Sequence, residues 1–261
     1  MVTNTNNDKI IICIEGNIGV GKSTFIDIIK TKWDYDGGCE VVPEPVDLWK
    51  NLINTDGKNI LQTFYEDIPR WAYSFQNMAC ITRMMKIEES IRNSGHKYIF
   101  LDRSLGTDKN VFEAMLYKQG QMNELEHSMY NLWCDFYHKY VRSQSNQIYI
   151  YLKASPETCA SRIKKRRRVE EESISLDYLR GLNEYHDSWL SMEPNVVIID
   201  CEEEFENDLD KHNSMINQIK SKLHSIANEN KNKNKIELKI DNETIADNKT
   251  NLRKNFVLEN L

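Results

Sequence analysis

The chain has 261 residues, of which 40% are hydrophobic, so it is long enough to form one sizeable α/β domain with a real core. Its net charge of −6 argues against a general nucleic-acid binder, because an acidic surface repels the phosphate backbone that dominates such affinity. No apolar run approaches the roughly eighteen residues that a membrane span needs. We therefore expect small molecules as ligands, and neither nucleic acid nor a membrane as a partner.

Six cysteines are scattered along the chain, without a Cys-x-x-Cys pair or a histidine at metal-binding spacing. This pattern is typical of reduced thiols in a cytosolic protein. The first nine residues contain no arginine and lead into the first predicted strand, which fits neither a secretory signal nor a transit peptide. We expect a cytoplasmic location.

The segment Gly16–Ser23 is a complete Walker A loop. It lies between a predicted buried strand at Ile10–Ile14 and a predicted helix from Thr24 to Trp33, which is the context that such a loop needs. Its glycines let backbone N–H groups surround phosphate oxygens, while Lys22 supplies charge near the β- and γ-phosphates and Ser23 a hydroxyl for Mg²⁺. The predicted triphosphate-binding residues are Gly16, Asn17, Ile18, Gly19, Val20, Gly21, Lys22, Ser23 and Thr24.

Four further predicted strands are separated by predicted helices. This alternation is typical of a parallel sheet with helices on both faces, so we expect an α/β fold of the P-loop NTPase type with a five-stranded parallel sheet. The two longest predicted helices, 68–93 and 123–144, carry apolar and aromatic stripes that indicate core packing or a dimer seam. The four strands are Glu40–Val42, Lys97–Leu101, Gln147–Leu152 and Asn195–Ile199.

From about Asn228 the composition shifts to alternating Asn and Lys, which is typical of segments that bury too little apolar surface to fold. We expect one folded domain over residues 1–228 and a flexible tail over residues 229–261. A weak alternation of apolar residues within 236–240 is compatible with one short ordered segment in that tail.

Two predicted strands lead into an aspartate, at Asp102 and at Asp200. A P-loop enzyme needs an acidic residue for Mg²⁺ beside its phosphate loop. Asp102 is the better candidate, because Arg103 and Ser104 follow it directly and place a cation and a hydroxyl at the carboxyl edge of the sheet, where ligands bind. The alternative is a surface ion pair of Asp102 with Arg103.

Glu44 follows the second predicted strand and stands between two prolines, so it should also face the ligand edge. A carboxylate held there can accept a proton from a substrate hydroxyl as a general base. The alternative is a solvated loop acid, and position alone does not separate the two.

The basic run Arg162–Arg168 follows the fourth predicted strand and a helix that Ser155 and Pro156 begin. A basic run is usually a solvated helix face. In a triphosphate enzyme, Arg162 and Arg166 would lie one helical turn apart and could close as a lid over the transferring phosphoryl group. The acidic residues 170–172 come directly after the run and make a nucleic-acid patch less favoured.

These motifs stand in one order with several others: Gly16–Thr24, Glu44-Pro45-Val46 with Trp49, Tyr65, Pro69-Arg70-Trp71, Phe75-Gln76, Asp102-Arg103-Ser104, Pro156–Cys159, Arg162, Arg166, Arg168, Glu170, Glu171 and His186–Leu190. In this combination the chain resembles the deoxynucleoside kinases, the deoxycytidine, deoxyguanosine and thymidine group of the P-loop fold. The resemblance spans residues 9 to about 225. Two features depart from the family pattern: Asp102 stands where a glutamate is frequent, and the proline before Arg70 is displaced by one position.

The resemblance implies a role for each of these residues. Glu44 would be the general base on the 5′-hydroxyl of a nucleoside, with Arg103 holding that hydroxyl. Tyr65 and Glu171 would bind the sugar 3′-hydroxyl, and Gln76 would contact the base edge. Further implied contacts are Trp49, Phe75 and Phe112 on the base, Arg162, Arg166 and Arg168 as lid arginines, and Glu204 and Phe205 beside the donor base.

The preferred base depends on one helical face that presents Gln76, Ala79 and Arg83, together with Asp108 just beyond the Asp-Arg-Ser turn. A carboxylate accepts from an exocyclic amino group, and an arginine donates to a ring nitrogen or a guanine oxygen. Arg83 and Asp108 therefore favour cytosine, adenine or guanine over thymine, in agreement with the resemblance. Ala79 and Gly106 are small and leave room for a purine. The alternative is a structural ion pair behind the pocket.

The resemblance thus implies a homodimeric enzyme of deoxynucleotide salvage. It would use ATP and Mg²⁺ to phosphorylate the 5′-hydroxyl of deoxyguanosine, deoxyadenosine or deoxycytidine. A nucleoside-monophosphate kinase is one alternative, but it would need cations for the acceptor phosphate where this chain has Glu44, Tyr65 and Glu171. A catalytically silent assembly subunit is another, but it would lack the loop lysine, the base or the lid arginines.

Overall fold

The computed structural model describes residues 9–168, 171 and 174–228. Contacts divide the chain into two units, one of Met1–Ile216 and a second that begins at Asn217. The strands, the phosphate loop and every candidate site residue belong to the first unit. The predicted tail, 229–261, lies outside the described residues, so its boundary at residue 228 stays a prediction.

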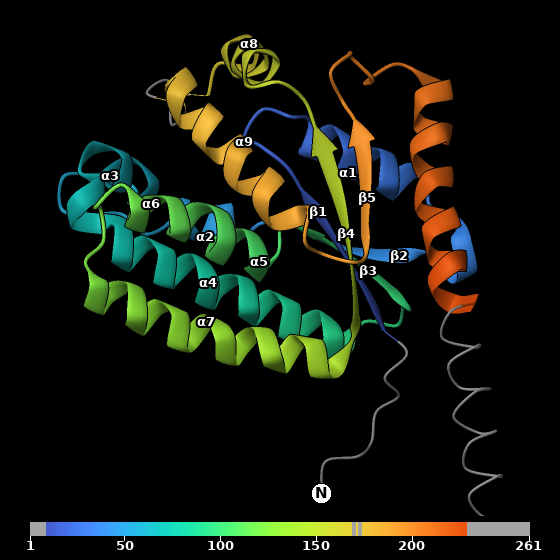
Figure 1. Ribbon diagram of the computed structural model, residues 1–261, viewed down its shortest axis with the longest axis horizontal. Helices are drawn as coiled ribbons and strands as arrows, with labels where there is room; N and C mark the ends of the chain where they lie inside the picture. The colour runs from blue at the N-terminus through green and yellow to red at the C-terminus, as the bar shows by residue number, and fades with distance from the viewer. Residues whose placement is uncertain (1–8, 169–170, 172–173, 229–261) are drawn as a thin grey trace, which may run out of the picture. The chain divides into compact units, whose positions relative to one another are not determined.

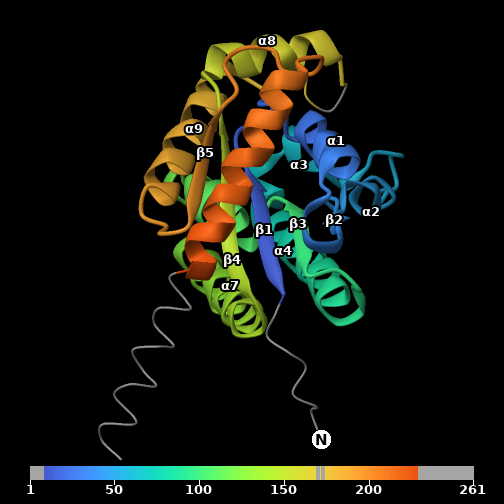
Figure 2. The same ribbon diagram turned by 90° about the vertical axis from the view of Figure 1, so that its right-hand side faces the viewer.

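The five strands form one parallel sheet in the order β2-β3-β1-β4-β5. This confirms the predicted sheet and places each strand within one residue of its predicted bounds; Figure 2 shows the order across the sheet. Because β1 lies between β3 and β4, the chain changes direction across the sheet there, and ligands bind at the carboxyl ends beside such a point. The strands are β1 (Ile10–Glu15), β2 (Cys39–Val42), β3 (Tyr98–Asp102), β4 (Asn146–Lys153) and β5 (Val196–Asp200).

Helices connect the strands, and the two long predicted helices are confirmed as α4 (Ile68–Asn93) and α7 (Glu124–Gln144). In Figure 1 they run side by side, and α8 lies beyond the arrowheads of the strands. Residues 209–228 are also helical. The remaining elements are α1 (Lys22–Lys32), η1 (Tyr35–Gly37), α2 (Val46–Lys50), α3 (Ile60–Glu66), α5 (Leu105–Thr107), the π-helical η2 (Asp108–Glu113), α6 (Ala114–Lys118), α8 (Pro156–Arg166) and α9 (Leu176–Leu190).

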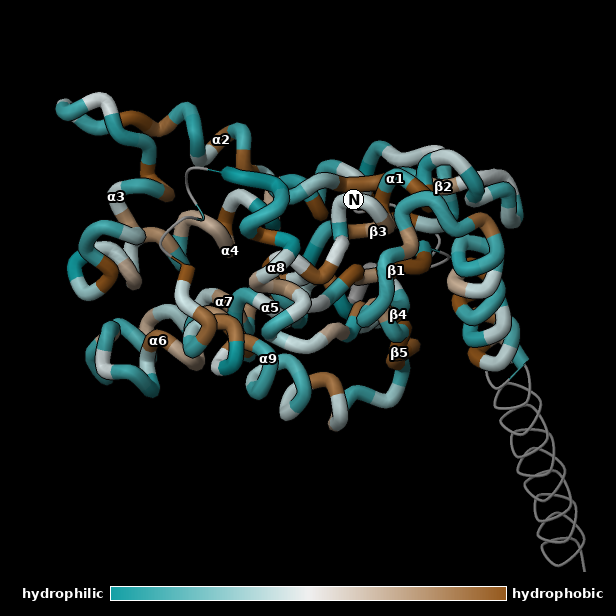
Figure 3. The backbone as a smooth tube through the Cα atoms, turned by 90° about the horizontal axis from the view of Figure 1, so that it is seen from above, coloured by the Kyte–Doolittle hydropathy of each residue, from teal (hydrophilic) through white to brown (hydrophobic). Residues whose placement is uncertain are grey.

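The core lies on both faces of the sheet, because alternate strand residues point to opposite sides. Ile11 and Ile99 belong to one buried cluster with residues of α4 and α7. On the other face, Phe100 packs edge-to-face against Trp33 at the end of α1, with ring centroids 4.9 Å apart. The central strands are accordingly hydrophobic along most of their length (Figure 3).

Side-chain caps begin both long helices. Asp67 accepts a hydrogen bond from the backbone N–H of Arg70 at 3.3 Å, and Pro69 occupies the first turn of α4, where its missing N–H costs nothing. Asn123 and Glu126 form a reciprocal capping box at the start of α7. These ends fix where α4 and α7 start relative to the sheet.

The six cysteines are free thiols, five of them buried and Cys39 partly exposed. Among the described residues, no helix combines the length and the apolarity that crossing a membrane requires.

Candidate active site

The phosphate loop joins β1 to α1, and its backbone passes so close to neighbouring elements that two positions require glycine. Gly16 has a φ of +142°, and a Cβ there would lie 2.5 Å from the carbonyl oxygen of Leu152 on β4. Gly19 has a φ of +84°, and its Cβ would lie 2.5 Å from the carbonyl oxygen of Cys159 on α8. The loop therefore lies against β4 and α8, with the anion-binding N-terminus of α1 directly after it.

Two side chains hold this loop in shape. Lys22 Nζ donates to the carbonyl oxygens of Gly16 at 3.0 Å and Asn17 at 2.8 Å. Burial, together with the nearby Arg103, lowers the pKa of Lys22 to about 7. Asn17 Nδ2 donates to the carbonyl oxygen of Leu179 at 2.8 Å, which fastens the loop to α9. This tie was not predicted, because nothing in the sequence relates Asn17 to a residue on α9.

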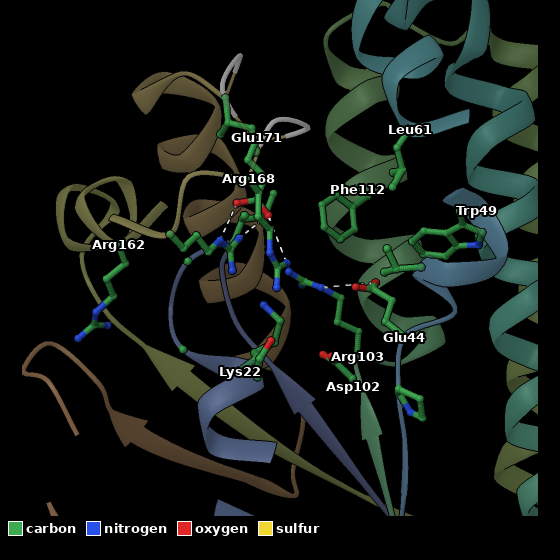
Figure 4. A pocket seen from close by; sticks show the side chains of 18 of the residues that line it. Lys22, Glu44, Trp49, Leu61, Asp102, Arg103, Phe112, Arg162, Arg168 and Glu171 are labelled. Carbon is green, nitrogen blue, oxygen red and sulfur yellow. Dashed lines mark hydrogen bonds and ion pairs between the residues drawn. The ribbon is translucent and has the colours of Figure 1, made fainter. Parts of the chain in front are cut away.

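Arg103 follows β3 directly and has a left-handed backbone, with a φ of +66°. Its backbone N–H donates to the carbonyl oxygen of Ile14 at 3.0 Å, so the turn is attached to the strand that precedes the phosphate loop. Its guanidinium carbon lies 5.0 Å from the ring centroid of Phe112, and its Nε lies 3.8 Å from Glu44 Oε1. The predicted cation and the predicted general base are therefore neighbours (Figure 4).

Arg83 of α4 connects three predicted site residues. Its Nε donates to Asp108 Oδ2 at 2.7 Å, and its Nη2 donates to Asp108 Oδ1 at 3.2 Å and to Glu44 Oε1 at 2.8 Å. Its Nη1 donates to the backbone carbonyl oxygen of Asp102 at 2.8 Å. The side chains of Arg83 and Asp108 are only 4% and 2% exposed. Arg83 and Asp108 thus form the buried ion pair named as the alternative, and both also line the cavity, so their role at the base stays a prediction. The link from Arg83 to Glu44 was not predicted.

These cations decide the protonation of Glu44. Burial alone would raise the pKa of the Glu44 carboxyl, but Arg83 and Arg103 outweigh burial and lower it. Burial, reinforced by the charge of Glu44, instead raises the pKa of the Asp102 carboxyl. Glu44 is therefore ionised near neutral pH and able to accept a proton.

A cavity of about 750 Å³ joins the phosphate loop to α4 and contains nearly all the predicted site residues in its wall. Gly16, Asn17 and Val20 are the three predicted loop residues that do not line it. Residues that line it without having been predicted include Phe64, Ile174 and Tyr178, whose apolar or aromatic type does not distinguish a pocket wall from a core. The predicted residues in the wall are Ile18, Gly19, Gly21, Lys22, Ser23, Thr24, Glu44, Trp49, Tyr65, Phe75, Gln76, Ala79, Arg83, Asp102, Arg103, Asp108, Phe112, Arg162, Arg166, Arg168, Glu171, Glu204 and Phe205.

Aromatic rings form the end of the cavity beside α4. Trp49 Nε1 donates to Thr82 Oγ1 at 3.0 Å, and the Trp49 ring meets Phe75 edge-to-face at 5.5 Å between centroids. Phe64 stacks on Phe75 at 4.7 Å. These contacts fix a flat apolar slot, and Gln76, which is 3% exposed, supplies a polar group at its wall.

The cavity wall also includes Tyr65 and Glu171. Arg166 Nε donates to Glu171 Oε2 at 2.7 Å, and Arg168 Nη1 lies 3.7 Å from Glu171 Oε1 (Figure 4). Burial, with the charge of Glu171, raises the pKa of Tyr65 to about 12, so its phenol is neutral and can donate a hydrogen bond. Two of the predicted lid arginines thus contact the predicted sugar-binding acid.

Arg162, the third predicted lid arginine, has different partners. Its Nη1 donates to the carbonyl oxygens of Cys201 at 2.8 Å and Val20 at 3.2 Å. These bonds connect α8 to the phosphate loop and to the segment after β5. Phe205 of that segment also packs on the loop, since a Cβ on Gly21 would lie 2.8 Å from Phe205 Cζ. Arg162 therefore connects the phosphate loop to the segment after β5.

The expectation that Gly106 leaves room for a base was wrong. A Cβ at Gly106 would collide with the indole of Trp189 on α9, and Gly106 does not line the cavity. The small size of Gly106 makes room for Trp189. Ala79 does line the cavity, and the room it leaves for a purine stays a prediction.

Ser23 and Asp102, the two predicted metal ligands, both line the cavity. Asp102 Oδ1 is buried and has no hydrogen-bond partner among the described residues. A hydroxyl and a carboxylate are hard oxygen donors, and Mg²⁺ is usually bound by one or two carboxylates completed by phosphate oxygens and waters. The donor set fits Mg²⁺.

The chain is similar to several known kinases. Residues 12–224 match the family model described as deoxynucleoside kinase. The chain is 35% identical over 247 residues to a deoxycytidine kinase of Mus musculus, with 82% of this chain and 91% of that protein covered. It is 31% identical over 241 residues to a mitochondrial deoxyguanosine kinase of Xenopus laevis, with 80% of this chain and 88% of that protein covered. It is 34% identical over 215 residues to a probable deoxycytidine kinase of fowlpox virus, with 80% of this chain and 86% of that protein covered.

Proposed function

The chain belongs to the deoxynucleoside kinase family, and from this premise we propose that it transfers the γ-phosphoryl group of ATP to the 5′-hydroxyl of deoxyguanosine, deoxyadenosine or deoxycytidine. The family makes the chain a phosphotransferase that acts on deoxynucleosides; the donor, the base and the residue roles are proposals. The observation that carries them is one cavity in whose wall the phosphate loop, Glu44 and the pair Arg83 and Asp108 meet.

Glu44 is the proposed general base. Its lowered pKa leaves an ionised carboxylate, and Arg103 is near enough to hold the same hydroxyl and to stabilise the charge that develops. In the transfer, the 5′ O–H bond breaks and its proton passes to a Glu44 oxygen. The freed oxygen bonds to the γ-phosphorus while the bond from that phosphorus to the diphosphate breaks, and ADP leaves.

The donor triphosphate lies along the loop in this proposal. Lys22, which donates to two loop carbonyl oxygens, would exchange these bonds for phosphate oxygens. Arg166 and Arg168 would turn from Glu171 toward the transferring group as the lid. Glu204 and Phe205 would lie beside the donor base. Ser23 and Asp102 would hold Mg²⁺, which neutralises charge on the β- and γ-phosphates when bound.

The acceptor nucleoside occupies the other end. Tyr65 and Glu171 would bind the sugar 3′-hydroxyl, one as a donor and the other as an acceptor. The base would lie between Phe112 and the aromatic slot of Trp49 and Phe75, with Gln76 and Asp108 at its edge. The Asp108 carboxylate accepts from the exocyclic amino group of cytosine, adenine or guanine, and thymine has none.

Neither alternative from the sequence is favoured. A nucleoside-monophosphate kinase is disfavoured by the family and by Glu44, Tyr65 and Glu171 in the acceptor wall. A silent subunit would lack part of the machinery, but the loop lysine, the base and the lid arginines all line the cavity.

A homodimer is part of the proposal. α7 exposes Leu132, Trp133 and Phe136, whose exposed fractions are 72%, 53% and 61%. Met85 of the neighbouring α4 is 63% exposed. Exposed apolar patches of this kind mark interaction surfaces, and a second copy of this chain is the partner that we propose. A cytoplasmic location and a role in deoxynucleotide salvage stay predictions.

The decisive experiment is turnover of the four natural deoxynucleosides with ATP and Mg²⁺. Phosphorylation of deoxyguanosine, deoxyadenosine or deoxycytidine at the 5′ position, with thymidine far slower, supports the proposal. Fastest turnover with thymidine would overturn the base assignment, and turnover only of 5′-monophosphates would overturn the acceptor assignment.

A further inference from the structure

The segment that carries Asp108 and Phe112 is a π-helix, η2, between the short helices α5 and α6. Its wider winding is visible where the backbone N–H of Ala114 reaches the carbonyl oxygen of Lys109, five residues earlier. π-helical turns are rare, have poorer geometry than α-helix and occur frequently at functional sites. Such a turn needs contacts outside itself to persist.

One side of η2 faces the cavity. Asp108 and Phe112 line it, Asp108 paired with Arg83 and the Phe112 ring next to the Arg103 guanidinium. Asn110 also ties the segment back to α5, since its Nδ2 donates to the carbonyl oxygen of Gly106 at 3.0 Å. The positions of Asp108 and Phe112 thus depend on how η2 is wound and turned.

The other side of η2 is held by α7 through two charged contacts. Lys109 forms an ion pair with Asp135, and Glu113 accepts a hydrogen bond from His127 Nδ1 at 2.6 Å. Glu113 is almost fully buried, with 1% of its side chain exposed. A buried carboxylate is costly without a partner, so the contact to His127 fixes the end of η2 strongly.

His127 is itself held in place. Its ring stacks on Tyr117 of α6, with centroids 3.8 Å apart and the planes 5° from parallel. Asn131 Nδ2 donates to the backbone carbonyl oxygen of His127 at 2.9 Å. Two pairs therefore connect η2 to α7 and are called the clamp below: Lys109 with Asp135 near the start of η2, and Glu113 with His127 at its end.

We propose that the two contacts Lys109–Asp135 and Glu113–His127 are positioning contacts that set nucleoside selectivity by holding η2 in its π-helical winding. This rests on the proposed role of Asp108 and Phe112 at the base. Without the clamp, the segment can relax toward ordinary α-helical winding, which turns Asp108 and Phe112 relative to one another and to Arg83. η2 contributes no residue to the end of the cavity where we propose that ATP binds. Loss of the clamp should therefore leave the KM for ATP unchanged.

The test uses Lys109→Met, since Lys109 and Asp135 are partly exposed, at 26% and 50%, and the variant should fold. We expect KM for the preferred nucleoside to rise about 3- to 10-fold and discrimination against thymidine to fall by a similar factor, with KM for ATP unchanged, because only acceptor positioning is lost. The charge-reversed double variant Lys109→Asp with Asp135→Lys should restore both quantities. Lys97→Met, which breaks the ion pair to Asp36 at the opposite end of β3, is the matched control and should change neither.

Unchanged relative kcat/KM values for the four nucleosides in folded Lys109→Met would overturn the proposal, and so would a charge-reversed pair that behaves like the single variant. Asp108→Ala separates this from the proposed function. If Asp108→Ala shifts base preference and Lys109→Met does not, the proposed role of the clamp is wrong and the proposed function stands. If Asp108→Ala leaves base preference unchanged, the assigned base contact is wrong and the clamp falls with it.

Discussion

Arg83 Nη2 lies 2.8 Å from Glu44 Oε1, so the arginine expected to recognise the base also holds the proposed catalytic carboxylate. The same guanidinium donates twice to Asp108 and once to the backbone of Asp102. A guanidinium has five N–H groups, and these four bonds leave one of them, on Nη1, for a nucleobase. Recognition of the base therefore falls more on Asp108 and Gln76 than the sequence alone suggested.

Replacing Glu44 by Gln should lower kcat by roughly 100-fold or more while leaving nucleoside binding largely intact, because proton acceptance in the transition state is what is lost. Glutamine keeps the size of the side chain and an oxygen for Arg83. Steady-state kinetics and equilibrium titration of the nucleoside measure the two effects separately. Glu66→Gln, at an exposed ion pair with Lys58, is the control. A near-normal kcat in the Glu44 variant would remove Glu44 from the mechanism.

The double variant Arg83→Met with Asp108→Ala should shift the preference toward thymidine by about 10-fold or more in relative kcat/KM, because no buried charge is then left unpaired against thymine. The two changes belong together, since removing Arg83 alone leaves Asp108 buried without its cation. Competition assays with mixed deoxynucleosides measure the ratio. An unmutated enzyme that already uses thymidine as well as its best substrate contradicts the assigned role of the pair.

Acid should destabilise the protein partly through His186. This residue is fully buried, its Nδ1 donates to the carbonyl oxygen of Leu182 at 2.7 Å, and burial, with Arg103, lowers its pKa to about 3. In the unfolded chain a histidine has a pKa near 6.5, so between these values only the unfolded state binds the proton and stability falls as pH falls. The loss from this group is about 2 kcal/mol on going from neutral pH to pH 5.

His186→Phe keeps a ring against Tyr151 and removes the titrating group. Urea unfolding at pH 7 and pH 5 should show a smaller acid-induced loss in this variant than in the unmutated protein, even if both its stabilities are lower. His96→Phe, at an exposed position, should leave the acid-induced loss unchanged. Equal losses in His186→Phe and the unmutated protein would refute the assignment.

Trp133→Glu on the exposed face of α7 should give a monomer, because a charge in the centre of an apolar interface is costly to bury. Sedimentation or light scattering measures the mass, and a matched change outside this face, Met192→Glu, should leave it unaltered. If the Trp133 variant keeps the mass of a dimer, or the unmutated protein is already a monomer, the proposed homodimer face is wrong.

Deletion of residues 229–261 should leave kcat/KM and the melting temperature almost unchanged, since an Asn- and Lys-rich composition predicts little buried apolar surface. Differential scanning calorimetry and the nucleoside assay check this directly. A marked drop in either quantity would show that this segment is part of the folded enzyme.

The sheet was predictable because its strands contain apolar runs, and the phosphate loop because its glycines, lysine and serine have fixed spacing. The placement of Glu44, just after β2, and of Asp102, at the end of β3, followed from the rule that ligands bind at the carboxyl ends of parallel strands. Each of these patterns is local in the sequence. Each strand begins and ends within one residue of its predicted bounds.

What escaped prediction is non-local. The tie from Asn17 to Leu179 and the contact of Glu113 with His127 join segments that no local pattern relates. Gly106 was misjudged for the same reason, because its neighbour Trp189 lies 83 positions along the chain. The π-helical winding of η2 depends on those distant contacts and has no periodic signal of its own.

The left-handed backbone of Arg103 has one further consequence. Such a conformation costs a residue with a Cβ about 1–2 kcal/mol, and glycine adopts it freely. Arg103→Gly would therefore relax the turn, but it would also delete a buried guanidinium that packs on Phe112 and lies beside Glu44. The backbone strain thus stands where the proposed catalytic cation is presented, a placement typical of functional sites.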